Sequence, residues 1–150
     1  TFDYDWGPDF NANDGSGGNM ELFGNFEITY GKDKRSFWSF PRAARKKYRE
    51  RGEFNENASF TFRSPNENAS FDLTLFLMEA DGKPKDDDAF TNAGGTTEGN
   101  MPKTLTLSSL RDGEEIVIRV YAIAEKRGRK EVINSEWVEF YVRVNKKYLY

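Results

Sequence analysis

Hydrophobic and polar residues alternate with a period of two along most of the chain. Between Met20 and Tyr30, the even positions are apolar or glycine and the odd positions are mostly polar. Such alternation is typical of a β-strand with one buried face, because successive side chains of a strand point to opposite sides. The same pattern predicts further strands over residues 58–63, 70–77, 105–107, 116–124 and 138–144.

Turn-forming residues separate these segments, since Gly, Asp, Asn and Pro gather in short runs between them. These runs cover residues 14–18, 31–33, 81–84, 92–95, 112–113 and 127–129. Strands of this number and spacing predict an all-β fold, an antiparallel β-sandwich or jelly roll, in a single domain over residues 1–150. The last two long strands, joined across residues 125–131, are expected to form a β-hairpin.

Residues 41–52 interrupt the alternation. The segment is rich in helix-forming Ala, Arg and Lys, begins with Pro41 and ends with Gly52. Proline near the start and glycine at the end are typical of a helix. The sequence therefore predicts one short helix inserted between strands.

Composition excludes several classes of chemistry. The 150 residues contain no Cys and no His, which removes thiolate nucleophiles, zinc-thiolate sites and His-based catalytic triads. Any metal would be held by oxygen ligands, as Ca²⁺ or Mg²⁺ is. The net charge of -3 argues against nucleic acid as a partner. Without a nucleophile motif, only carboxylates are left as catalytic candidates, and we expect a protein that is not an enzyme.

Oxygen donors recur at alternate positions in the N-terminal segment. A loop that curls around Ca²⁺ presents every second side chain inward and fills the gaps with main-chain carbonyls. We therefore expect residues 3–15 to form an acidic loop. Its candidate metal ligands are Asp3, Asp5, Asp9, Asn11, Asn13 and Asp14.

A second acidic segment follows the strand at 70–77. It contains Asp81 and the consecutive Asp86, Asp87 and Asp88. If this strand runs antiparallel to residues 20–30, both acidic segments lie at the same end of the sandwich. Three adjacent carboxylates repel one another unless they are solvated or neutralised, and a divalent cation is one neutraliser. A solvated acidic loop with Asx-turns is the equal alternative.

The order of these features resembles C2-like β-sandwich domains, including those appended to bacterial secreted proteins such as pore-forming toxins. The resemblance rests on an Asp- and Gly-rich leader that runs into residues 21–28, followed by strands and an Asp-rich loop. It implies a C2-like layout, Ca²⁺ as cofactor and docking on phospholipid. It also implies ligand roles for Asp5, Asp14, Asp81, Asp86 and Asp88. The leader departs from the C2 pattern because it precedes the first strong strand.

Aromatic and basic residues stand side by side after residue 36. Such a combination suits a membrane interface, where rings lie at headgroup depth and cations meet anionic lipid, or another polyanion such as an acidic glycan or RNA. The commoner role of a charge run is a solvated face beside a core strand. The candidate surface-binding residues are Trp38, Arg42, Arg45, Lys46, Lys47 and Arg49.

Together these features predict a non-catalytic binding or targeting domain of a larger extracytoplasmic protein. The expected cofactor is Ca²⁺, and the expected partners are a membrane surface or a glycan and the other domains of the parent polypeptide. An extracellular or cell-surface location is inferred from the possible use of Ca²⁺ and from Thr1 in place of Met. One alternative is a carbohydrate-binding module with structural Ca²⁺, in which Trp6, Trp38 or Trp137 stacks on sugar. Another is a structural or assembly domain without a small ligand.

Overall fold

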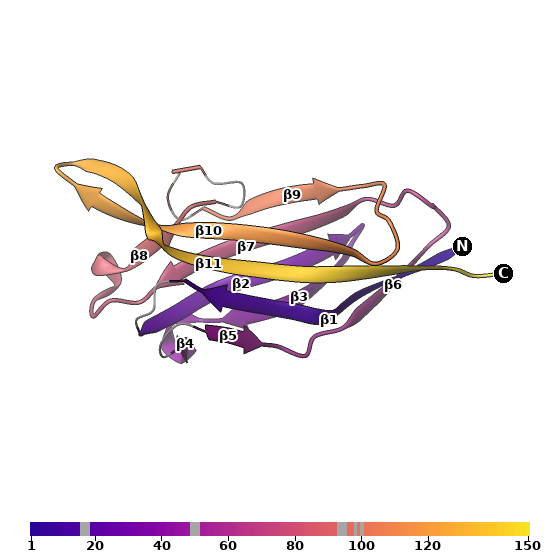
Figure 1. Cartoon of the computed structure of the whole chain (residues 1–150), viewed down its shortest axis with the longest axis horizontal. Helices are drawn as coiled ribbons and strands as arrows, with labels where there is room; N and C mark the ends of the chain where they lie inside the picture. Colours follow the sequence, from indigo (N-terminus) through magenta and orange to yellow (C-terminus); the bar gives the residue numbers. More distant parts are fainter. Residues whose placement is uncertain (16–18, 49–51, 93–95, 98, 100) are drawn as a thin grey trace.

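A computed structural model describes residues 1–15, 19–48, 52–92, 96–97, 99 and 101–150, and Figure 1 shows its arrangement. The described residues form an antiparallel sheet of 11 strands, so the predicted all-β class is confirmed. Two short 3₁₀ turns lie between strands: η1 (Arg42–Ala44) between the third and fourth, and η2 (Pro84–Asp86) between the seventh and eighth. The strands are β1 (Phe2–Asp14), β2 (Met20–Tyr30), β3 (Asp33–Phe40), β4 (Lys46–Tyr48), β5 (Gly52–Asn55), β6 (Phe60–Ser64), β7 (Phe71–Glu79), β8 (Asp88–Phe90), β9 (Lys103–Leu107), β10 (Glu114–Lys126) and β11 (Arg129–Tyr148).

The sheet folds back on itself into a sandwich-like, nearly closed barrel (Figure 1). One layer contains β3, β2 and β7, with β4 paired to β2 and β9 paired to β7. The other contains β10, β11 and β1, with β5 and β6 both paired to β1. The short strand β8 joins the layers, because it pairs with β7 at Met78 and Glu79 and with β10 at Ala122 and Ile123.

Aromatic side chains fill the space between the layers. The ring of Phe26 on β2 lies 5.3 Å from that of Phe140 on β11 and 5.8 Å from that of Phe10 on β1. Trp6 and Phe71 meet in the same way, with ring centroids 5.3 Å apart. Few residues thus bury a large apolar area, which explains how a chain with 37% hydrophobic residues builds a core.

Alternation of apolar and polar residues predicted the buried faces of the central strands correctly. Along β2 the even positions from Met20 to Ile28 are buried and the odd ones are half-buried. The other predicted strands correspond to β6, β7, β9, β10 and part of β11. The predicted hairpin is confirmed as the pairing of β10 with β11, from Glu114 opposite Val144 to Lys126 opposite Arg129.

The expected acidic loop at residues 3–15 is wrong, because residues 2–14 form strand β1. Tyr4, Trp6, Phe10 and Ala12 are buried on its inner side, and they supply the apolar face that a strand needs. The register of β1 against β11 shifts at a bulge between Gly7 and Asn11, and the buried residues before and after this bulge stay on the inner side of the strand. The residues interpreted as alternate ligands of a curled loop are therefore mainly the outward positions of a strand.

The helix predicted over residues 41–52 is much shorter in the structure. Of the described residues of this segment, only Arg42–Ala44 form a helical turn, whereas Lys46–Tyr48 pairs with Met20–Leu22 as β4 and Gly52–Asn55 forms β5. Residues 49–51 lie outside the described residues. The segment lacks an apolar stripe at helical spacing, so the open edge of β2 offers it more stabilisation than a helix would. In the ranges described, no helix has the length and apolar character needed to span a membrane.

Candidate functional site

The two ends of the sandwich differ in what they carry. The first and last residues lie together at one end of the long axis, and the tip of the β10–β11 hairpin lies at the other (Figure 1). The start of β2 and the end of β7 also meet at the hairpin end, since Leu22 pairs with Glu79. The antiparallel pairing on which the convergence of the acidic segments depended is thus confirmed.

A pair of carboxyl groups lies at this end. Glu79 and Asp88 are opposite each other in the β7–β8 pairing, and their side chains share a hydrogen bond. Burial and the neighbouring Asp88 raise the pKa of Glu79 to about 8, with smaller contributions from Glu136 and Asp14. Burial also raises the pKa of Asp88. Glu79 therefore favours its protonated form at neutral pH, in which its O–H donates a hydrogen bond to the Asp88 carboxylate.

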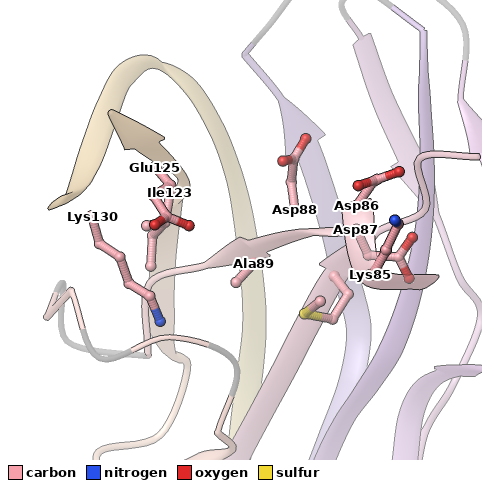
Figure 2. Close-up of a pocket in the computed structure, with 9 residues that line it drawn as sticks. Lys85, Asp86, Asp87, Asp88, Ala89, Ile123, Glu125 and Lys130 are labelled. Carbon is pink, nitrogen blue, oxygen red and sulfur yellow. The ribbon is translucent and has the colours of Figure 1, made fainter. Parts of the chain in front are cut away.

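A cleft of about 310 Å³ opens beside this pair, between the β7–β8 connection and the outer part of the hairpin (Figure 2). Its apolar lining residues are Met78, Ala89 and Ile123. Figure 2 shows Glu125 and Lys130 on the hairpin, across the cleft from Asp86 and Asp88. Lys85 and Asp87 complete the lining. These charged side chains offer ion pairs and hydrogen bonds to a ligand.

The predicted ligands of the first acidic segment have partners within the chain. Asp3 accepts two hydrogen bonds from the Arg63 guanidinium, at 2.9 and 3.3 Å, which lower the pKa of Asp3. Asp5 accepts one from Thr61 at 2.7 Å, and Asp9 lies 3.0 Å from Arg143.

The two asparagines and the last aspartate of the segment are divided between the faces of β1. Asn11 and Asn13 are half-buried, whereas Asp14 is buried and contributes to the electrostatic environment of Glu79. Among the described residues, no three His, Cys, Asp or Glu side chains lie close enough to hold a metal ion. Ca²⁺ binding therefore stays a prediction.

The second acidic segment contacts the basic segment. Arg42 donates two hydrogen bonds to the Asp87 carboxylate, at 2.7 and 2.9 Å, and these lower the pKa of Asp87. The main-chain N–H of Asp81 donates a third, at 3.0 Å. Asp81 and Asp86 have exposed side chains, and Asp88 is half-buried. Two segments interpreted as separate binding sites thus partly neutralise each other.

The remaining candidate surface-binding residues are divided between the core and the surface. Trp38 is 2% exposed and its indole N–H donates to the Tyr48 hydroxyl at 3.1 Å, so the outer surface does not include it. Arg45 lies 3.5 Å from Glu21, and Lys46 lies over the Phe40 ring. Lys47 is exposed at the mouth of a second cleft. Arg49 is outside the described residues.

We expect Arg42→Gln to lower the thermal midpoint by a few degrees, because it removes both side-chain donors to a carboxylate that is only 4% exposed. The double variant Arg42→Gln/Asp87→Asn should recover part of this loss, since the unpaired charge is then gone. Thermal melts of the wild type, Arg42→Gln, Asp87→Asn and the double variant form a double-mutant cycle that measures this coupling. Strictly additive effects would contradict the coupling.

The sequence interpretation missed a basic hairpin arm, which we define as residues 122–133. Arg127 and Gly128 form its two-residue turn with φ angles of 53° and 76°, as a type I′ turn requires. Residues 126–130 read Lys-Arg-Gly-Arg-Lys, and the side chains of Arg127, Arg129 and Lys130 are exposed. The density of basic residues around the turn was a signal available in the sequence, but the run was interpreted only as turn chemistry.

The arm cations differ from most other arginines of the protein. Arg42, Arg45, Arg63, Arg119 and Arg143 each lie within 4 Å of a carboxylate. Arg127, Arg129 and Lys130 form no ion pair with any residue that the structure describes. The tip of the arm therefore carries uncompensated positive charge.

None of the three tryptophans offers a free ring face for sugar stacking. Trp6 is fully buried, as Trp38 nearly is. Trp137 is half-buried: the Arg119 guanidinium carbon lies 4.0 Å from its ring centroid, and Gly15 packs so close that an added Cβ would lie 2.0 Å from the ring. The feature that a carbohydrate-binding module would use is thus engaged inside the domain.

Comparison with models of known protein families finds no match for this chain. Comparison with curated proteins finds none either. The functional interpretation therefore rests on the geometry described above.

Proposed function

We propose that this chain is a non-catalytic binding domain that attaches a larger extracytoplasmic protein to a surface, and that the arm end makes the contact. The observation that carries the proposal is the tip of the arm, where Arg127, Arg129 and Lys130 are exposed and form no ion pair with the described residues. Uncompensated charge gathered at one point attracts a partner of opposite charge.

The position of the chain ends supports this arrangement. The main-chain N–H of Leu149 donates to the carbonyl of Thr1 at 2.8 Å, so the two ends leave the domain side by side. They do so at the end opposite the arm (Figure 1). Flanking domains of a parent polypeptide would then leave the arm free to meet a partner.

The chemistry of the cleft favours binding over catalysis. Glu79 and Asp88, the two carboxyl groups at the cleft whose pKa is raised, are hydrogen-bonded to each other across strands β7 and β8. The chain has no His or Cys to act as base or nucleophile. Ca²⁺ belongs to the proposal as a cofactor of the acidic residues at this end, Asp14, Asp86 and Asp88, bound by fewer than three carboxylates together with water, because no three described carboxylates lie close enough to share one ion.

A glycan is the second candidate partner, and the exposed Tyr148 is the observation that favours it. Tyr148 is 54% exposed and its ring centroid lies 5.2 Å from that of Tyr150, so the two form an aromatic surface. This surface lies on β11 near the chain ends and away from the arm, so a glycan bound there would engage the opposite end of the domain (Figure 1).

The test is a binding panel with the intact chain. Phosphatidylcholine vesicles, the same vesicles with phosphatidylserine, and neutral and acidic polysaccharides are pelleted with the protein, in Ca²⁺ and in EDTA. The proposal expects saturable binding to an anionic member of the panel. Binding to a neutral polysaccharide alone would favour the glycan candidate, and binding to no member would overturn the proposal.

A further inference from the structure

We infer that the hairpin arm docks the domain on a membrane that contains anionic phospholipid, through the cations of Arg127, Arg129 and Lys130. This inference rests on the proposed function and names the partner of the same site. Three observations support the arm as the contact. Its three cations are exposed, the arm lies at the end of the molecule opposite the chain ends, and these cations form no ion pair with the described residues.

The backbone of the arm is suited to present these side chains. Beyond Ile123, the described pairings of β10 are only those with β11: Ala124 with Glu131, Glu125 with Lys130 and Lys126 with Arg129. A register shift opposite Tyr121 and Ala122 bulges β11 at the base of the arm. Because bulges bend and twist a strand pair, the arm leaves the sandwich as a separate ribbon. Figure 1 shows it extending beyond the rest of the molecule.

The tight turn concentrates the charge. In a type I′ turn the two strands keep their pairing up to the residues that flank the turn, so Arg129 follows Arg127 and Gly128 at once. Lys130 pairs with Glu125 in the ribbon, yet the two side chains form no ion pair among the described contacts. Arg127 and Arg129 are thereby held at the turn, and Lys130 lies one position behind them on the side of the arm that lines the cleft.

The charge of the rest of the chain favours a planar partner over a polymer. Residues 125–131 contain four basic and two acidic residues, a net charge of +2, which leaves -5 for the remainder of a chain whose net charge is -3. Asp86 and Asp88 lie across the cleft from the arm, and Glu125 lies on the arm itself, paired with Lys130 (Figure 2). A flat membrane can contact the projecting tip alone. A nucleic acid or acidic polysaccharide long enough to follow the arm would meet these carboxylates.

The expected strength follows from the number of cations. Each Lys or Arg close to an anionic bilayer strengthens binding roughly fivefold, so three contribute about a hundredfold. The attraction decays within about 8 Å at physiological ionic strength, so binding should weaken steeply as salt is added. The acidic body would be repelled from the same surface, which orients the domain with the arm toward the lipid.

The experiment compares two charge variants of the full chain on vesicles. The arm variant is Arg127→Asn/Arg129→Gln/Lys130→Gln, and asparagine is chosen at position 127 because it tolerates the positive φ of the turn. The control variant is Lys32→Gln/Lys34→Gln/Arg35→Gln. It also removes three positive charges, but from the β2–β3 hairpin, where Lys34 forms an ion pair with Glu27 and Arg35 forms one with Asp33.

We expect the arm variant to bind phosphatidylserine-containing vesicles about a hundredfold more weakly and the control variant to bind within about twofold of the wild type. Wild-type binding should also vanish on pure phosphatidylcholine and at high salt, which tests the inference even if the arm variant fails to fold. Equal losses in both variants, salt-insensitive binding, or tighter binding to double-stranded DNA or heparin than to vesicles would overturn it. Binding that survives loss of the arm charges contradicts only this inference, whereas binding to no surface contradicts the proposed function.

Discussion

Replacing Phe26 with alanine should lower the free energy of unfolding by about 3–5 kcal/mol, the cost of removing a large aromatic side chain from a closed core. Phe26 is fully buried. Its ring lies 5.3 Å from the rings of both Phe37 and Phe140, so its loss opens a cavity between strands of both layers. Neighbouring rings can fill that space only by leaving their own contacts.

Guanidinium unfolding followed by tryptophan fluorescence measures this effect. The midpoint should fall while the dependence on denaturant stays the same, because stability changes and the surface exposed on unfolding does not. Val117→Ala is the matched control, since Val117 is 52% exposed on the outer face of β10 and should change stability by less than about 0.5 kcal/mol. Similar midpoints for Phe26→Ala and Val117→Ala would contradict the assignment of the core.

The carboxyl pair at β8 should make the protein less stable as pH rises. Glu79 has a pKa of about 8 in the folded chain and its usual value of 4.5 when unfolded, so between these values the folded state holds a proton that the unfolded state has released. The free energy of unfolding therefore falls as pH rises from about 4.5 to about 8, and this contribution is constant above that range. Glu79→Gln mimics the protonated form and should remove this pH dependence.

The expected gain for Glu79→Gln is on the order of 1–2 kcal/mol above about pH 8, reduced from the full linkage value because solvent reaches part of the side chain. Thermal or denaturant unfolding at a series of pH values measures it. Glu67→Gln is the control, because Glu67 is exposed on the loop before β7 and should leave the pH profile unchanged. Parallel profiles for Glu79→Gln and the wild type would show that the pair does not hold a proton.

The sequence was most informative where one face of a strand is buried. In β2, and in β7 as far as Leu77, the buried positions are the alternating residues that the sequence pattern predicted, because burial of one face enforces a period of two. Alternation alone did not show that β8 joins the layers, since this strand has only three residues and depends on distant partners.

The N-terminal segment shows why a candidate site is harder to predict than a strand. Asp3, Asp5 and Asp9 occupy alternate positions, a spacing shared by a Ca²⁺ loop and by the outward face of a strand. The buried positions of the same segment, Tyr4 and Trp6, distinguish the two, because a loop around a cation has no use for large apolar side chains on its other side.

The partners of the charged residues could not be predicted from local patterns. Arg42 and Asp87 are 45 positions apart and meet only because β2 and β7 are neighbours. A different long-range pairing, with Met20–Leu22 of β2, turned Lys46–Tyr48 into a strand despite its helix-forming residues. In contrast, the uncompensated charge of the arm is local and follows from a two-residue turn flanked by basic residues.

The pairing of β1 with β11 also bears on how the chain acquires its structure during synthesis. β1 is the first strand to leave the ribosome, and β11 is the last. Until β11 emerges, the edge of β1 that pairs with it stays open, and such unpaired strand edges promote aggregation. Contacts between distant parts of a chain also slow folding. Asp3, Asp5 and Asp9 alternate along this strand, and charged side chains on an unpaired strand disfavour its pairing with another chain.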